Sequence, residues 1–269
     1  MKNIIYILNF LIFVSCNESS QIKNDLTELD LKGNVKSLVE FSYPKLSTNW
    51  EYKDIEYHFD NSGYLIKKID FDYDTYTEFN FDDKNRISQG KQYSLNDSLM
   101  FNGIYKYENQ KLKKREVLNL ENEIVYSAEY TYSNPSNGTT LIEEKEYDQK
   151  NNLQRHSTIL QNSKKQDIAW NEFNLEGKLM SRHDYKYNDK GNRIEYVKKD
   201  STNELKWRVE TKYNTDNLEI ERILYNPKLD KKTIRISTYE FDNMENWIVK
   251  YQIQNNDTLK TFKRKIKYY

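Results

Sequence analysis

The chain has 269 residues, and its 42 Lys and Arg balance 42 Asp and Glu, so the formal net charge at pH 7 is zero. A neutral balance provides no large basic or acidic field for recruiting nucleic acid or another charged polymer. Disorder of the usual kind needs a high net charge, which is absent. Only 36% of the residues are hydrophobic, but 23 are Tyr, so tyrosine supplies much of the surface that folding can bury.

The first apolar segment runs from Ile4 to Val14, after Lys2. It is too short to span a bilayer, which needs about 20 residues, and it suits the apolar core of a signal peptide. Ser15 then precedes Cys16, the only cysteine in the chain. This order resembles the bacterial lipobox, in which the signal is removed and the new N-terminal cysteine is lipidated.

We therefore expect a signal peptide at residues 1–15, a lipid on Cys16 and a flexible tether at residues 16–30. The lipid would be the only membrane anchor, and it would place the protein in the bacterial cell envelope as an outer-membrane lipoprotein. The alternative is a buried N-terminal strand with a free thiol, but no later segment is as apolar.

A short phrase recurs through the rest of the chain: an aromatic residue, then Asp or Asn, two free positions, and Gly or Asn. The first polar side chain can accept backbone N–H bonds two residues ahead, and Gly or Asn tolerates the positive φ that closes a type I turn with a bulge. Each copy therefore predicts an antiparallel hairpin. The turn-defining residues are Asp60, Gly63, Asp82, Asn85, Asp148, Asn151, Asn174, Gly177, Asn188, Gly191, Asn214, Asn217 and Asp242.

Between these turns apolar and polar residues alternate with period two, as in residues 124–132, 205–213 and 247–254. This alternation is typical of strands with one wet face. We predict an all-β fold, an elongated antiparallel meander of repeated β-hairpins with about 18 strands and no major helix after the signal peptide. Residues 31–269 would form a single domain, and whether the sheet is open, spiral or closed stays undecided.

A longer period is also present, because Tyr107, Tyr147 and Tyr187 are spaced by 40 residues. Three strands fit into such a unit, whereas a propeller blade needs four. We therefore expect three-strand units that bury their faces on one another along a continuous meander.

The segment from Tyr187 to Ile194 resembles the YD repeat of bacterial RHS-type proteins, and residues 31–43 are similar to the opening of uncharacterised lipoproteins from Bacteroidetes-type bacteria. The resemblance implies a β-repeat architecture. Only Gly63, Gly177 and Gly191 keep the glycine of the turn, and the spacing varies. We therefore take the resemblance to imply architecture and not toxin delivery.

Sequence signals for catalysis are weak. The histidines His58, His156 and His183 have no second ligand at a metal-binding spacing, and His183 falls on the apolar side of its strand. Asp70, Asp72 and Asp74 are spaced like the start of a calcium loop, but Thr75 stands where that loop needs Gly. We expect no catalytic residues, no cofactor and no metal, with these three aspartates as the weak metal candidate.

Trp207, Trp247, Tyr185 and Tyr187 are candidates for stacking on a ligand, although the same rings would serve equally as core. The basic segment from Lys260 to Lys267 is interpreted as the solvated face of an edge strand and not as a nucleic-acid site. Three functions stay open. They are a non-enzymatic, lipid-anchored envelope protein that binds or scaffolds a partner protein or glycan, a glycan-binding or glycan-processing accessory protein, and a remnant of an RHS-type secretion or toxin shell.

Overall fold

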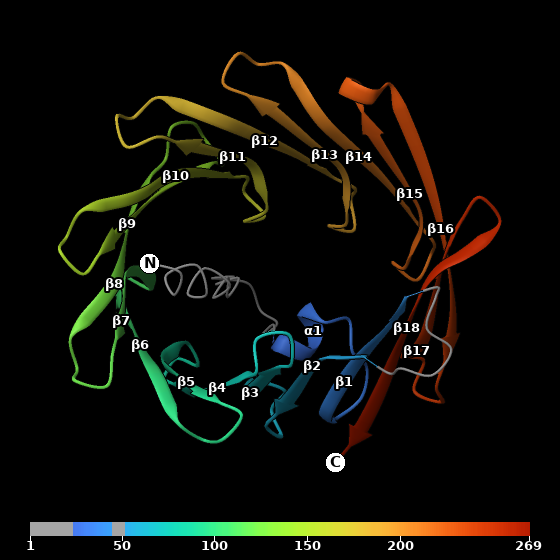
Figure 1. Ribbon diagram of the computed structural model, residues 1–269, viewed down its shortest axis with the longest axis horizontal. Helices are drawn as coiled ribbons and strands as arrows, with labels where there is room; N and C mark the ends of the chain where they lie inside the picture. Colours follow the sequence, from blue (N-terminus) through green and yellow to red (C-terminus); the bar gives the residue numbers. More distant parts are fainter. Residues whose placement is uncertain (1–23, 45–51) are drawn as a thin grey trace.

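A computed structural model describes residues 24–44 and 52–269 (Figure 1). Residues 1–23, which include the expected signal peptide and Cys16, lie outside the described residues. The short helix α1 (Asp25–Glu28) is followed by eighteen strands. The strands are β1 (Val35–Pro44), β2 (Tyr52–Phe59), β3 (Leu65–Asp70), β4 (Thr75–Phe81), β5 (Ile87–Ser94), β6 (Leu99–Glu108), β7 (Lys111–Leu118), β8 (Ile124–Ser133), β9 (Thr140–Asp148), β10 (Leu153–Gln161), β11 (Asp167–Phe173), β12 (Leu179–Tyr187), β13 (Arg193–Asp200), β14 (Leu205–Tyr213), β15 (Glu219–Asn226), β16 (Lys231–Phe241), β17 (Trp247–Gln254) and β18 (Asp257–Tyr268), with the short 3-10 helix η2 (Pro227–Leu229) between β15 and β16.

Each strand pairs antiparallel with the next, which confirms the predicted all-β meander of about 18 strands. The sheet also closes on itself. Strand β18 pairs with β1 over a long register, from Val35 opposite Tyr268 to Pro44 opposite Lys260, so the strands form a barrel (Figure 1). The interpretation of the basic C-terminal segment as an edge strand is therefore wrong, because β18 has a partner on both sides.

The repeated turn recurs at both rims of the barrel. At Asp60 the backbone N–H bonds to the carbonyl of Tyr64, the N–H of Gly63 bonds back to Asp60, and the side chain of Asp60 accepts the N–H groups of Ser62 and Tyr64. The same backbone pair of bonds, with positive φ at the fourth residue, is found at the other turns that the sequence marks, beginning at Asp82, Asp148, Asn174, Asn188, Asn214 and Asp242. The same turn also begins at Asn119, Asp200, Ser94 and Asn162, and none of these four positions matches the aromatic phrase.

The predicted three-strand unit is wrong. An antiparallel meander returns to the same direction and the same rim only after two strands, so an odd number of strands cannot be its repeat. The hairpin turns that begin at Asn162, Asn188 and Asn214 lie on one rim and are 26 residues apart. The turn after Tyr147, which follows β9, lies on the opposite rim from the turn after Tyr187, which follows β12.

Among the residues that the structure describes, a compact apolar cluster lies at the seam where β18, β1 and β2 meet. Leu26 and Leu31 pack there against Val35, Leu38 and Phe59. Residues 24–30, which the sequence analysis assigns to the tether, are thus folded onto the sheet, and α1 lies inside the ring beside β1 and β2 (Figure 1).

Candidate binding surface

The two faces of the sheet can be told apart from the position of α1. Leu38, Tyr57 and Ile266 lie directly opposite one another on β1, β2 and β18 and belong to the cluster that holds α1. Residues opposite each other on antiparallel strands present their side chains on the same face. Because α1 lies inside the ring, this set defines the inner face, and the strand register extends it around the barrel (Figure 1).

The outer face carries ion pairs between neighbouring strands. Lys106 lies 2.6 Å from Glu116, and Glu195 lies 2.5 Å from Lys186 and 2.7 Å from Arg208. The hydrogen bond from Lys186, together with the charge of Arg208, holds the pKa of Glu195 below its usual range. These outer charges are largely satisfied by their neighbours and by water.

Many aromatic rings lie on the inner face, although Tyr76 and Tyr93 stack on each other on the outer face. Trp170 contacts the His183 ring at a centroid distance of 4.5 Å, and Tyr185 stacks on Tyr196 at 5.6 Å. The Arg264 guanidinium lies over the Trp247 ring, 3.7 Å from its centroid. Tyrosine, tryptophan and arginine of this kind are the side chains that binding surfaces favour.

All four rings named as stacking candidates lie on the inner face. Tyr185, Tyr187, Trp207 and Trp247 are each partly exposed, neither buried in a core nor fully open to solvent. The hydroxyl of Tyr187 donates a 2.8 Å hydrogen bond to the carbonyl of Asp167. Burial raises the pKa of Tyr185 to about 12, so its hydroxyl keeps its proton and can donate.

A chain of hydrogen bonds crosses the inner face from β13 to β11. The Tyr196 hydroxyl lies 3.0 Å from His183 Nδ1, and His183 Nε2 lies 3.1 Å from Ser181 Oγ. Ser181 Oγ donates in turn to Glu172 at 2.7 Å. Burial, and then the charge of Lys198, hold the pKa of His183 below its usual range. A neutral ring that donates to Ser181 and accepts from Tyr196 satisfies all of these contacts.

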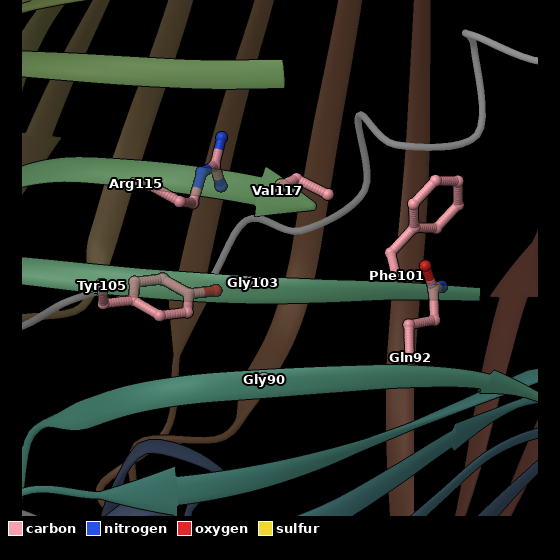
Figure 2. Close-up of a pocket in the computed structure, with 7 residues that line it drawn as sticks. All are labelled: Gly90, Gln92, Phe101, Gly103, Tyr105, Arg115 and Val117. Atoms are coloured by element: carbon pink, nitrogen blue, oxygen red, sulfur yellow. The ribbon is translucent and has the colours of Figure 1, made fainter. Parts of the chain in front are cut away.

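Two glycines open a notch in the inner face. Five of the seven glycines have positive φ, but Gly90 and Gly103 do not, and they lie directly opposite each other on β5 and β6. Gly in a strand interior marks a close approach of other atoms. The hydroxyl of Tyr105 points over Gly103 in Figure 2, and it has no hydrogen-bond partner among the described residues. The cavity of about 20 Å³ has room for one water-sized group.

Arg115 lines the same notch from β7 (Figure 2). Its Nη2 donates to the Tyr126 hydroxyl at 3.0 Å, and the Tyr130 hydroxyl donates to Glu144 at 2.8 Å. Nearby tyrosine hydroxyls and Glu144 outweigh the burial of the guanidinium and raise the pKa of Arg115. The notch thus combines a fixed cation with hydroxyl groups.

The three aspartates that the sequence offers as a weak metal candidate lie at the end of β3 and in the turn that follows it. Asp70 ends β3 and Asp74 has a φ of 52° in the turn before β4, and Asp70, Asp72 and Asp74 do not gather into a site. Within the described ranges, no group of three or more His, Cys, Asp or Glu could hold a metal ion.

In residues 24–44 and 52–269, no helix combines the length and apolar character needed to cross a membrane.

Sequence reasoning missed the cations of the inner face. Lys260 and Arg264 share it with Phe262, whereas Lys263 and Lys267 point outward and are exposed. Along β18 the alternation alone gives this division into two sets. Only the closure against β1 shows which set faces inward.

No family model matches the sequence, and no curated protein matches it. Among solved structures, the chain is similar to a porin-like protein from Bacteroides uniformis, with a TM-score of 0.46 at 13% identity, over 88% of this chain and 99% of that one. A porin-like protein from Bacteroides vulgatus follows, with a TM-score of 0.40 at 12% identity, over 87% and 98%. A Tc holotoxin pore from Photorhabdus luminescens has a TM-score of 0.25 at 10% identity, over 79% of this chain and 15% of that one.

Proposed function

We propose that this protein is a non-enzymatic binding protein of the bacterial cell envelope, anchored by a lipid on Cys16, and that the inner face of the barrel is its binding surface. The observation that carries the proposal is the contrast between the two faces. Outer charges such as Glu116 and Glu195 are held in ion pairs, whereas inner rings such as Tyr185 and Trp207 are partly exposed beside unpaired cations.

Ser181 and His183 form the cluster that most resembles a catalytic site, and their burial and hydrogen bonds agree with a binding role without catalysis. Ser181 and His183 are only 7% and 5% exposed, and each polar atom of the pair is occupied by Glu172, Tyr196 or the other member of the pair. A serine whose proton goes to a carboxylate and whose histidine is buried has no open path to a substrate.

The anchor sets how far the barrel can lie from the membrane. Residues 17–23 separate Cys16 from the first described residue, and a fully extended chain spans at most about 3.6 Å per residue, so a lipid on Cys16 would hold Asn24 within about 30 Å of the membrane surface. The charged outer face suits water at that position.

The binding surface can be tested with two variants of adjacent residues on β14. Trp207→Ser alters the inner face, and Arg208→Ser alters the outer face. Each immobilised protein is incubated with solubilised envelope, and bound proteins and sugars are identified. We expect Trp207→Ser to lose components that the unaltered chain and Arg208→Ser both retain. If the two variants retain the same set, the inner face is not the binding surface.

A glycan is the ligand that the inner face favours over a protein partner. Partly exposed rings such as Tyr196 and Trp207 alternate with charged side chains over several strands, and sugars are bound by stacking on rings with hydrogen bonds at their edges. A protein partner would need a continuous apolar core in its interface, which these strands do not offer.

A further inference from the structure

Cations without a carboxylate partner gather on the inner face of strands β13–β18. Arg193, Lys198, Arg235 and Lys260 lie there, and none has an ion pair with a carboxylate among the described residues. On the outer face of the same part of the sheet, Arg208 and Lys212 are paired at 2.7 Å and 2.8 Å with Glu195 and Glu221. The other outer cations there, Lys232, Lys263 and Lys267, are exposed to water. The chain is neutral overall, but this part of its inner face is basic.

Two of the inner cations lie directly opposite each other. Arg222 on β15 is the cross-strand partner of Arg235 on β16. Like charges in this position destabilise a sheet. Arg222 contacts Glu219, while Arg235 donates only to the amide oxygen of Gln254, at 3.3 Å. An anion between the two guanidinium groups would relieve this repulsion.

A third guanidinium is buried with unused bonding capacity. The Arg264 side chain is 7% exposed, and its Nη2 lies 2.9 Å from Glu40. Its Nη1 is buried and has no hydrogen-bond partner among the described residues. A buried donor without a partner is costly, and Arg264 therefore keeps unused hydrogen-bonding capacity beneath this part of the inner face.

Aromatic rings are interleaved with these cations. Lys198 lies directly opposite Trp207, and Lys260 lies over the Phe262 ring, 4.6 Å from its centroid. Arg193 lies 5.5 Å and 5.9 Å from the ring centroids of Tyr185 and Tyr196. Rings would stack on the sugar faces of a ligand, and neighbouring cations would pair with acidic groups on the same sugars.

We propose that the inner face of strands β13–β18 binds an acidic glycan, a chain of pyranose rings that carry carboxylates. This inference rests on the proposed function and names the ligand class of the same surface. A single-stranded nucleic acid also combines rings with negative charge. We favour the glycan because the proposed envelope location presents glycans and not nucleic acids.

The test uses the full chain, purified in a non-ionic detergent, and four probes. Hexagalacturonate carries six carboxylates, its methyl ester removes the charges from the same sugar chain, cellohexaose is a neutral glycan, and a thymidine hexanucleotide is a nucleic acid of similar charge. We expect calorimetric binding of hexagalacturonate that weakens as salt is raised. The methyl ester and cellohexaose should bind at least about tenfold more weakly, because the charge interactions are lost.

Two matched triple variants assign the binding to one face. Lys198→Gln, Arg235→Gln and Lys260→Gln together remove three inner charges, and we expect about a tenfold or greater loss of hexagalacturonate affinity. Lys232→Gln, Lys263→Gln and Lys267→Gln together remove three exposed outer charges and should leave affinity unchanged. Circular dichroism establishes that both variants fold.

The outcomes of these experiments distinguish failure of the acidic-glycan proposal from failure of the proposed function. Equal binding of the methyl ester, or equal loss in both triple variants, overturns the assignment to inner cations. Nucleotide binding as tight as that of hexagalacturonate overturns the glycan class. If no probe binds but Trp207→Ser still loses envelope components, the acidic-glycan inference fails and the proposed function stands. If Trp207→Ser loses nothing, the proposed function itself fails.

Discussion

The hydroxyl of Tyr107 donates a 2.9 Å hydrogen bond to the carbonyl of Ile87, the residue that begins the preceding strand. Four more tyrosines make the same bond to a carbonyl 20 residues earlier. They are Tyr132 to Leu112, Tyr187 to Asp167, Tyr213 to Arg193 and Tyr239 to Glu219. The repeated tyrosine is therefore both a ring of the inner face and a tie between adjacent strands at one rim.

This tie predicts unequal effects of removing two hydroxyls from the same strand. Tyr107→Phe loses a bond and leaves a carbonyl unpaired, so we expect the free energy of unfolding to fall by about 1 kcal/mol. Tyr105→Phe removes a buried hydroxyl without a partner and should be neutral or stabilising. Urea unfolding of the two variants measures both values, and equal losses would show that the bond to Ile87 contributes nothing.

The turns predict a second effect. Gly191 has a φ of 90°, a conformation that a β-branched residue adopts only under strain. We expect Gly191→Val to lower the free energy of unfolding by about 1–3 kcal/mol. Gly191→Asn should cost much less, because Asn85 and Asn151 hold positive φ at the equivalent position of other turns. A thermal melt in which Val and Asn behave alike would contradict this account of the turn.

These turns were predictable from the sequence because they are local. Asp60 and Gly63 are three residues apart, and their chemistry alone defines the bend. The closure of the barrel was not predictable, because Leu38 pairs with Ile266 across almost the whole chain. No local pattern encodes such a long-range pairing.

The candidate binding surface could not be predicted for the same reason, because it depends on long-range pairing of strands. Alternation divides Lys260 from Lys263, but both sets of β18 contain charged residues, so neither looks like a buried face. Bulges add to the problem, since pairs such as Tyr187 and Arg193 shift the register at the strand ends. Net charge was equally uninformative, because it is zero while the inner cations gather on a few adjacent strands.

His183 predicts how stability depends on pH. Its pKa is lowered in the folded state by burial and by Lys198, whereas the pKa of the ring in an unfolded chain is about 6.5. As pH falls below that value the unfolded chain takes up a proton that the folded chain does not, so stability falls until the folded pKa is passed. We expect a lower free energy of unfolding at pH 5.5 than at pH 7.5.

The variant His183→Gln should reduce this difference between the two pH values. Urea unfolding at the two pH values measures this difference for the unaltered chain and for the variant. An unchanged difference in His183→Gln would mean that His183 is not its source.

Cys16 predicts the route of attachment to the membrane. If it carries the anchor, cells supplied with a fatty-acid probe should label the unaltered protein and not Cys16→Ala, which should also fail to be processed. A gel of labelled protein and a fractionation of membranes measure both properties. Equal labelling of the two proteins would remove the anchor from the proposed function.

Asn246 predicts that the barrel is locked at its seam. It is 1% exposed, its Oδ1 accepts the Lys32 N–H at 2.7 Å, and its Nδ2 donates to the Lys32 carbonyl at 2.9 Å and to the Tyr268 hydroxyl at 2.8 Å. Asn246→Ala removes the partner of the Lys32 N–H and carbonyl, so we expect a loss of about 1–3 kcal/mol and faster amide exchange in β1 and β18. Asn192 occupies the equivalent position of the turn at Asn188, where its side chain bonds only to Asn217. Asn192→Ala should cost less than about 0.5 kcal/mol, because an exposed hydrogen bond is replaced by water. If the two variants lose equal stability, or if β1 and β18 exchange no faster than β12 and β13 in Asn246→Ala, closure of the sheet does not depend on this side chain.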